Sequence, residues 1–167
     1  MKDRFFRLAL TLLKPYNFSM KQQDIINILK SQIKHASIPS GIDAIYLYGS
    51  AIRGRLRKDS DIDIAILTSY DVEDSERLEL ISKAEAIFTL LLKKIGIQLE
   101  ISIFDLRGKY ASVQLQYKVI TEGIALYTKD VSERLEFENA IKREYFDFEP
   151  YLRSLRKRKY GDILQKV

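Results

Sequence analysis

The stretch Tyr48-Gly-Ser-Ala-Ile-Arg-Gly-Arg-Leu-Arg-Lys-Asp-Ser-Asp-Ile-Asp-Ile-Ala-Ile-Leu67 decides the fold of this chain. It begins where a β-branched and aromatic run, residues 45–48, is broken by Gly49 and Ser50, which is typical of a strand that ends in a turn. A glycine at this place lets the backbone come close to a ligand. Residues 51–56 are expected to begin a short helix, whose free N–H groups would face a group lying over Ser50. The stretch therefore predicts a phosphate-binding turn.

Two side chains of this turn suit phosphate oxygens. The Ser50 hydroxyl is a neutral donor, and the Arg53 guanidinium, one turn further on, is a charged fork that matches phosphate geometry. Arg53 has a simpler alternative role as a solvated helix residue. We predict that Gly49, Ser50 and Arg53 bind the phosphates of a nucleotide.

Two carboxylates follow at a spacing that places them on one face of a strand. Asp61 and Asp63 alternate with three isoleucines, and a period of two indicates a strand whose i and i+2 side chains share a face. We expect the isoleucines to enter the core behind the acids. Adjacent carboxylates repel, but they become favourable around Mg²⁺, which prefers a few carboxylates plus phosphate oxygens. The pair predicts a site for two Mg²⁺ ions, which can activate an attacking oxygen and neutralise a pyrophosphate leaving group.

A third acid is expected from a neighbouring strand, predicted at 97–104. Its apolar residues make one face, and the other face is formed by Gln98, Glu100 and Ser102. Glu100 is therefore the candidate for the third acid, although an acid at an exposed strand edge is the simpler alternative. Asp105 has the opposite parity and resembles a turn residue.

Four segments of the chain resemble a known family. Residues 49–54, Gly-Ser-Ala-Ile-Arg-Gly, followed by 60–64, Ser-Asp-Ile-Asp-Ile, resemble the signature of the DNA polymerase β-like nucleotidyltransferase superfamily, in its minimal nucleotidyltransferase branch. Residues 117–127 and 144–151 resemble the region after the third acid and the C-terminal helix of that branch. The resemblance extends over about residues 22–152. Members of the family usually carry Asp as the third acid, where this chain has the longer Glu100.

The resemblance implies an α/β (α+β) nucleotidyltransferase fold, in which helices pack against a small mixed β-sheet and the active site lies at one open end. It also implies a metal-dependent enzyme that uses ATP, with Asp61, Asp63 and Glu100 as catalytic, Mg²⁺-binding residues. Minimal nucleotidyltransferases are often antitoxins paired with a HEPN-domain ribonuclease toxin, so the resemblance implies AMP transfer to a tyrosine of such a partner. Two alternatives stay open: a small acceptor such as an aminoglycoside, and a non-catalytic module that masks its partner.

Periodicity outside the site predicts one domain of alternating helices and strands. A chain of 167 residues has enough apolar content for a single core. The pattern predicts helices at about 20–36, 72–95 and 113–121 and from 132, and a short strand at 124–127. In the helix at 72–95, an apolar stripe predicted to lie in the core consists of Leu78, Ile81, Ile87, Leu91 and Ile95.

We predict that the chain is divided into an N-terminal arm or extension (residues 1–18), a nucleotidyltransferase domain (19–152) and a basic C-terminal tail (153–167). The net charge is +5, and its densest basic run, a solvated helix face or tail, is Arg153, Arg156, Lys157, Arg158 and Lys159. We do not expect direct nucleic-acid binding, because no stacking or base-reading motif accompanies this run. The sequence is compatible with a homo-oligomer or a hetero-oligomer.

Other features of the composition bear on the compartment. The chain has no cysteine, which excludes disulfides and thiolate metal sites and fits a reducing compartment. Residues 4–13 are basic and then apolar, as in an export signal, but the apolar core is short and Arg7 interrupts it. No stretch is long enough to span a membrane. We therefore expect a cytoplasmic protein without a membrane partner.

Overall fold

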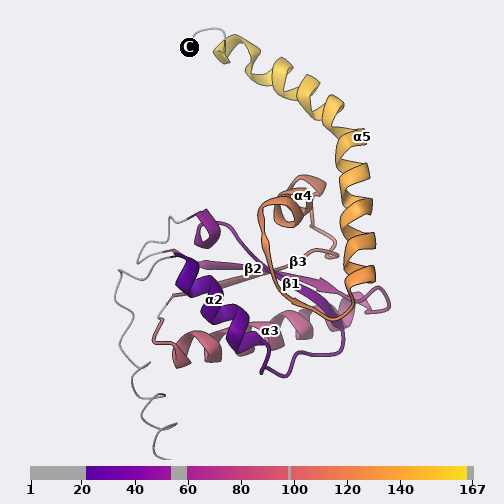
Figure 1. Cartoon of the computed structure of the whole chain (residues 1–167). Coiled ribbons are helices and arrows are strands. Elements are labelled where there is room, and N and C mark those ends of the chain that lie inside the picture. The colour runs from indigo at the N-terminus through magenta and orange to yellow at the C-terminus, as the bar shows by residue number, and fades with distance from the viewer. Residues whose placement is uncertain (1–21, 54–59, 98, 165–167) are drawn as a thin grey trace, which may run out of the picture.

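The computed structural model describes residues 22–53, 60–97 and 99–164, which form a four-stranded sheet with helices on both faces (Figure 1). The strands lie in the order β3-β2-β1-β4. Their bounds are Ile42–Tyr48 for β1, Ile62–Thr68 for β2, Ile101–Asp105 for β3 and Ile124–Thr128 for β4. β1 is antiparallel to both of its neighbours, whereas β2 and β3 are parallel. This mixed sheet confirms the predicted fold class.

The helices fall into two pairs, one for each face of the sheet. α2 (Gln22–Ile33) and α3 (Asp74–Lys94) pack on one face, and α4 (Val113–Glu122) and α5 (Val131–Leu164) pack on the other. A single 3₁₀ turn, η1 (Ala51–Arg53), follows β1. The predicted arm, 1–18, and residues 19–21 of the first predicted helix lie outside the described residues.

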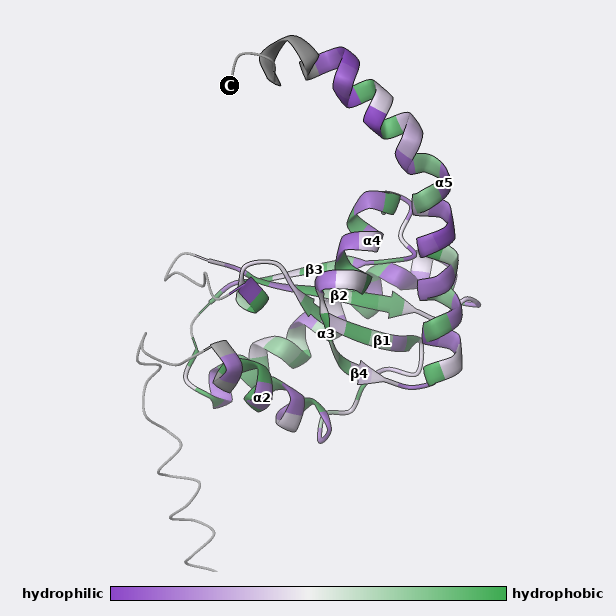
Figure 2. Cartoon of the chain, turned by 45° about the horizontal axis from the view of Figure 1, so that its top comes forward, coloured by the Kyte–Doolittle hydropathy of each residue, from purple (hydrophilic) through white to green (hydrophobic). Residues whose placement is uncertain are grey.

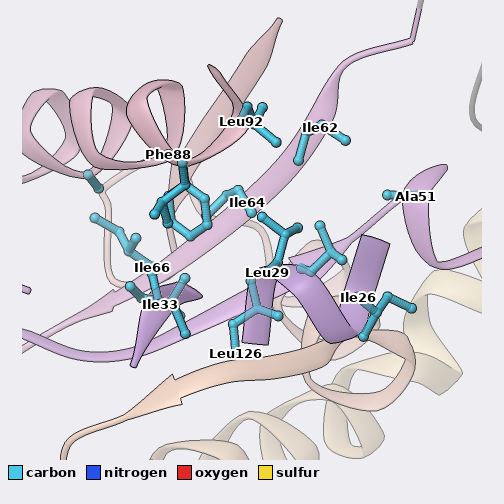
Figure 3. Close-up of a cluster of buried hydrophobic side chains, with 14 of the residues drawn as sticks. Ile26, Leu29, Ile33, Ala51, Ile62, Ile64, Ile66, Phe88, Leu92 and Leu126 are labelled. Atoms are coloured by element: carbon cyan, nitrogen blue, oxygen red, sulfur yellow. The ribbon is translucent and has the colours of Figure 1, made fainter. Parts of the chain in front are cut away.

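The larger of the two parts of the core lies between the sheet and the helices α2 and α3 (Figure 3). Its centre is the set of isoleucines on β2, Ile62, Ile64 and Ile66, all fully buried. Because strand side chains alternate, Asp63 and Ala65 must lie on the opposite face, toward α4 and α5. The prediction that the isoleucines enter the core behind the acids is confirmed.

The buried stripe of α3 differs in part from the predicted one. Leu78, predicted to lie in the core, is 71% exposed, and the buried residues are Leu80, Ala84, Phe88, Leu91 and Leu92. These follow the i, i+4, i+8 spacing of one helix face, and Leu78 lies about 200° around the helix from Leu80. The prediction was wrong at this residue because several apolar residues in this helix lie outside the core-facing stripe. Ile81, Ile87 and Ile95 pack against the core from its edge.

A hydrogen bond beneath α5 ties that helix to the centre of the sheet. The Tyr46 hydroxyl, on β1, donates to the Glu138 carboxylate at 2.9 Å, and Arg134 lies 3.4 Å from the same carboxylate. Burial and the nearby Glu138 charge raise the pKa of Tyr46 well above its usual range, so its hydroxyl stays neutral. This half of the core, which includes Phe137 and Ile141, fixes the first part of α5 over the sheet.

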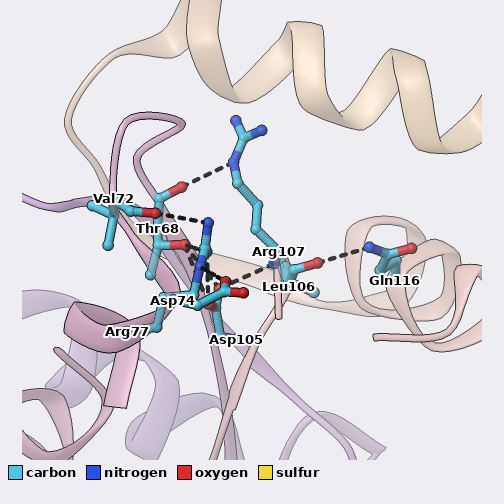
Figure 4. Close-up of polar contacts among 8 residues, drawn as sticks. All are labelled: Thr68, Val72, Asp74, Arg77, Asp105, Leu106, Arg107 and Gln116. Carbon is cyan, nitrogen blue, oxygen red and sulfur yellow. Dashed lines mark hydrogen bonds and ion pairs between the residues drawn. The ribbon is translucent and has the colours of Figure 1, made fainter. Parts of the chain in front are cut away.

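A buried polar cluster joins the far ends of β2 and β3 to α3 (Figure 4). The Arg77 guanidinium, from α3, donates to Asp105 at 3.0 Å and also to Thr68. The Asp105 carboxylate accepts further hydrogen bonds from the Thr68 hydroxyl at 3.1 Å and from the backbone N–H of Arg107 at 3.0 Å. Asp105, expected in a turn, is the last residue of β3 and a buried partner of Arg77.

The second half of α5 extends away from the sheet in both views of the chain (Figures 1 and 2). The helix runs without a break across residue 152, where the predicted domain ends, and the basic residues 153–159 are exposed on it. They lie on a continuous, exposed helix rather than in an irregular tail. The division of the chain into domains stays a prediction. Within the described ranges, no helix is both long and apolar enough to cross a membrane.

Candidate active site

The predicted phosphate-binding turn begins directly after β1. Gly49 has a φ of +73°, a left-handed conformation that L side chains rarely adopt, and it redirects the chain out of the sheet. The backbone N–H of Arg53 then donates to the Ser50 carbonyl at 3.2 Å, which closes the η1 turn. The helix predicted at 51–56 is therefore a 3₁₀ turn over its first three residues, and 54–56 lie outside the described part.

Asp63 lies against this turn. It is paired with Tyr48 across the antiparallel strands β1 and β2, so that its carboxylate reaches the residues that follow Tyr48. A Cβ placed on Gly49 would come 1.8 Å from the Asp63 Oδ2 atom. The backbone N–H of Ser50 donates a hydrogen bond to the same carboxylate. The structure thus brings together three of the predicted site residues, Gly49, Ser50 and Asp63.

The surroundings of Asp63 disfavour its negative charge. Burial raises the pKa of this carboxyl, and the negative charge of nearby Asp61 raises it further. The Ser50 N–H, Arg53 and Lys118 act in the opposite direction, but they do not cancel the effect of burial. An adjacent carboxylate pair of this kind fits a divalent cation, which would compensate the repulsion.

The third predicted acid, Glu100, immediately precedes β3. Its backbone carbonyl accepts a hydrogen bond from the Ile62 N–H at 2.8 Å, and the parallel register then pairs Asp63 with Ser102. Asp61 and Glu100 therefore stand directly before β2 and β3, which are neighbouring strands. By the alternation of strand side chains, both are on the face of the sheet that carries Asp63. However, no three acidic or histidine side chains in the described part of the chain lie close enough together to hold a metal ion. The acids share a face and an edge, and the role of Glu100 stays a prediction.

Arg53 makes an ion pair that the sequence did not suggest. Its Nη1 atom lies 3.5 Å from the Glu122 Oε2 atom of α4, and both side chains are about half exposed. The charge of Lys118, also on α4, acts on Asp63. α4 therefore contributes charged residues to the site. The i, i+4 spacing of Lys118 and Glu122 is the feature of the sequence that could have indicated this contribution, since it places both residues on one helix face.

Tyr48 is the cross-strand partner of Asp63. Burial raises the pKa of its hydroxyl, and the Asp63 charge raises it further. The ring packs at the edge of the cluster beneath α4 and α5. Tyr48 therefore stays protonated.

The sequence profile of one protein family, described as "Polymerase beta, Nucleotidyltransferase", matches residues 23–132, which is more than half of the chain. The chain belongs to this nucleotidyltransferase family. The match contains the Gly49 turn, both aspartates, Glu100 and the α4 residues. The predicted superfamily is thereby confirmed, and the site described above is the candidate active site of a nucleotidyltransferase.

Individual relatives of this nucleotidyltransferase agree with that assignment. It is 28% identical over 116 residues to the protein adenylyltransferase MntA of Shewanella oneidensis, a match that covers 70% of this chain and 71% of the relative. A crystal structure of a mutant MntA-HpeT toxin-antitoxin shares its fold, with a TM-score of 0.50 and 22% identity over 87% of this chain and 99% of that one. A toxin-antitoxin crystal structure with AMP-PNP has a TM-score of 0.50 and 23% identity, with the same coverage.

Proposed function

We propose that this nucleotidyltransferase transfers AMP from ATP to a tyrosine of a partner HEPN-type ribonuclease toxin and so acts as its antitoxin. The observation that carries this proposal is the contact between the Gly49-Ser50 turn and the Asp63 carboxylate, since it places a phosphate-binding turn beside an acid pair. The similarity to a protein adenylyltransferase supports AMP as the transferred group and a protein as the acceptor. The shared fold with a toxin-antitoxin structure that contains AMP-PNP supports an ATP-like substrate.

Each predicted residue has a role in this reaction. Asp61, Asp63 and Glu100 would hold Mg²⁺, and the half-buried Asp63 with its exposed, mutually repelling neighbour Asp61 offers suitable oxygen ligands for it. When bound, Mg²⁺ supplies charge neutralisation on the phosphates and on the leaving group. Ser50 and Arg53 would bind phosphate oxygens, and Gly49 leaves the space in which Asp63 lies.

The transfer itself forms one bond and breaks one. The tyrosine oxygen attacks the α-phosphorus of ATP, the bond from that phosphorus to the bridging oxygen of the β-phosphate breaks, and pyrophosphate leaves. The tyrosine proton is released in the same reaction. The residues of this chain act mainly by orienting the phosphates in line and by balancing their charge.

The acceptor is proposed to be a protein because the described part of the chain consists of one sheet and its covering helices. A partner that presents its own tyrosine supplies the docking surface that an acceptor-binding domain would otherwise provide. We place the reaction in the cytoplasm, where ATP is abundant.

A labelling experiment tests the proposal. The purified protein is incubated with α-labelled ATP and Mg²⁺, with and without the product of the neighbouring gene, and the label is followed by gel and by intact mass. We expect one or more AMP units on the partner, and none with the Asp61→Asn or Asp63→Asn variant. A stable complex that acquires no label would refute the transfer and favour a module that masks its partner by binding alone.

A further inference from the structure

The C-terminal end of α4 is fixed beside the phosphate-binding turn. The backbone N–H of Gly123 donates to the Val119 carbonyl at 2.8 Å, and Val119 is fully buried. A Cβ on Gly123 would lie 3.3 Å from the carbonyl oxygen of Leu47, two residues before Gly49. The lack of a side chain at Gly123 thus lets the end of α4 lie close against β1, and the last turns of α4 are held next to the site.

Two charged residues of α4 act on this site. Lys118 and Glu122 are four residues apart and therefore lie on one face of the helix. Glu122 contacts Arg53 through the 3.5 Å ion pair, which shows that this face is directed toward the turn. Lys118, an exposed residue, lies close enough for its charge to act on the Asp63 carboxylate. The turn is thus flanked by two cations, and an acid of the protein contacts one of them.

We propose that Lys118 is a second phosphate-binding cation and that Glu122 is a latch, which binds Arg53 until the phosphates of a nucleoside triphosphate replace it. This inference rests on the proposed function, because it concerns the same nucleotide. An exposed ion pair contributes little and exchanges readily. A phosphate group carries more charge than a carboxylate and suits the guanidinium fork. Lys118, one helical turn before Glu122 on the same face of α4, makes the site selective for the charged tail of a triphosphate over a monophosphate.

Calorimetric titration with α,β-methylene-ATP in the presence of Mg²⁺ tests the role of Lys118. Charge-assisted contacts predict that Lys118→Met weakens binding roughly ten- to hundredfold. The binding of AMP should change much less. The control is Lys109→Met, because Lys109 is an exposed lysine in the loop after β3, at the opposite end of the sheet. Far-UV circular dichroism and the melting temperature verify that both variants are folded.

The latch is tested by a double-mutant cycle. In the Glu122→Gln variant no carboxylate competes with the phosphates for Arg53. This variant should bind the analogue about two- to fivefold more tightly. In the Arg53→Met background the same substitution should change the affinity by less than about 1.5-fold, because the group that it releases is absent. Equal tightening in both backgrounds would overturn the latch.

The outcomes separate this inference from the function on which it rests. If the wild-type protein binds the analogue and Lys118→Met binds it equally well, the role of Lys118 is refuted and the proposed function stands. If the wild-type protein does not bind the analogue, both are refuted. Weakened binding by Lys118→Met together with tightening by Glu122→Gln that depends on Arg53 would support both parts of the inference.

Discussion

The carboxylate of Asp63 lies in the space that a side chain on Gly49 would occupy. An ideal Cβ on Gly49 would come 1.8 Å from the Asp63 Oδ2 atom and 2.6 Å from its Cγ atom. The two residues come from strands that are antiparallel neighbours, β1 and β2, and Gly49 follows the residue that is paired with Asp63. The first motif residue and the second metal-binding candidate are therefore parts of one contact, and a change in either should affect both.

Gly49→Ala should damage the site and the fold together. Alanine would be strained at a φ of +73° and would also displace the Asp63 carboxylate. We expect a loss of at least about 2 kcal/mol in the free energy of unfolding and the loss of AMP transfer. Urea denaturation and the labelling assay measure the two effects.

Gly41→Ala is the control for this substitution. A Cβ on Gly41 would meet only the ends of side chains, Leu80 Cδ1 at 2.9 Å and Val72 Cγ2 at 3.1 Å, and no backbone or carboxylate. Its effect should stay within about 1 kcal/mol, with transfer retained. If Gly41→Ala lost as much stability and AMP transfer as Gly49→Ala, Gly49 would be needed only as a small residue.

Asp63→Asn should abolish transfer and yet stabilise the protein when no nucleotide or metal is bound. The amide still accepts the Ser50 N–H bond, but it removes a charge that burial and Asp61 disfavour. We expect transfer to fall at least about a thousandfold and the melting temperature at pH 7 to rise. Asp61→Asn should also abolish transfer, with a smaller rise, because Asp61 is exposed.

The stabilising effect of Asp63→Asn should depend on pH. The pKa of Asp63 in the folded protein is raised above its ordinary value of 3.8, so its charge costs stability at pH values above the folded pKa. As the pH falls through the folded pKa and then below 3.8, the carboxyl is protonated in both states and the cost disappears. The advantage of the variant should therefore be full at pH 7 and absent in strong acid. An advantage that grew in acid would contradict this account.

Asp105→Asn should destabilise the protein with little direct effect on nucleotide binding. Asp105 is 4% exposed and compensates the Arg77 charge at the end of the sheet away from Asp63. We expect a cost of about 3 kcal/mol in urea denaturation, because the Arg77 charge loses its buried partner and keeps only the exposed Asp74. Asp74→Asn removes the other carboxylate bound to Arg77, but Asp74 is 83% exposed, so its cost should be under about 1 kcal/mol.

Tyr46→Phe should reveal the value of the hydrogen bond beneath α5. The substitution removes the 2.9 Å bond to Glu138 and should cost about 1–3 kcal/mol at pH 7. The pKa of Tyr46 is raised on folding, so this stabilisation is full below the ordinary value of 10.0 and is lost as the pH rises through the folded value. The wild-type advantage should thus shrink in alkaline solution. Tyr110→Phe, at an exposed site, should show neither effect.

Local patterns were sufficient to predict much of the site. The alternation of Asp61 and Asp63 with isoleucines predicted both a strand and its buried face, because side chains on a strand alternate regardless of what surrounds it. The Gly49-Ser50 break predicted the turn for a similarly local reason. The pattern of α3 was less informative, since an apolar residue such as Leu78 is compatible with either face until the packing is known.

The sequence by itself determined the family and the order of the elements, and it singled out the two aspartates and the turn as site candidates. Only the tertiary structure decided that Glu122 contacts Arg53, that the Lys118 charge acts on Asp63 and that Asp105 belongs to a buried ion pair with Arg77. The physical reason is separation along the chain. Periodicity reports which face of its own element a residue occupies, whereas the partner across that face depends on how elements far apart in sequence pack together.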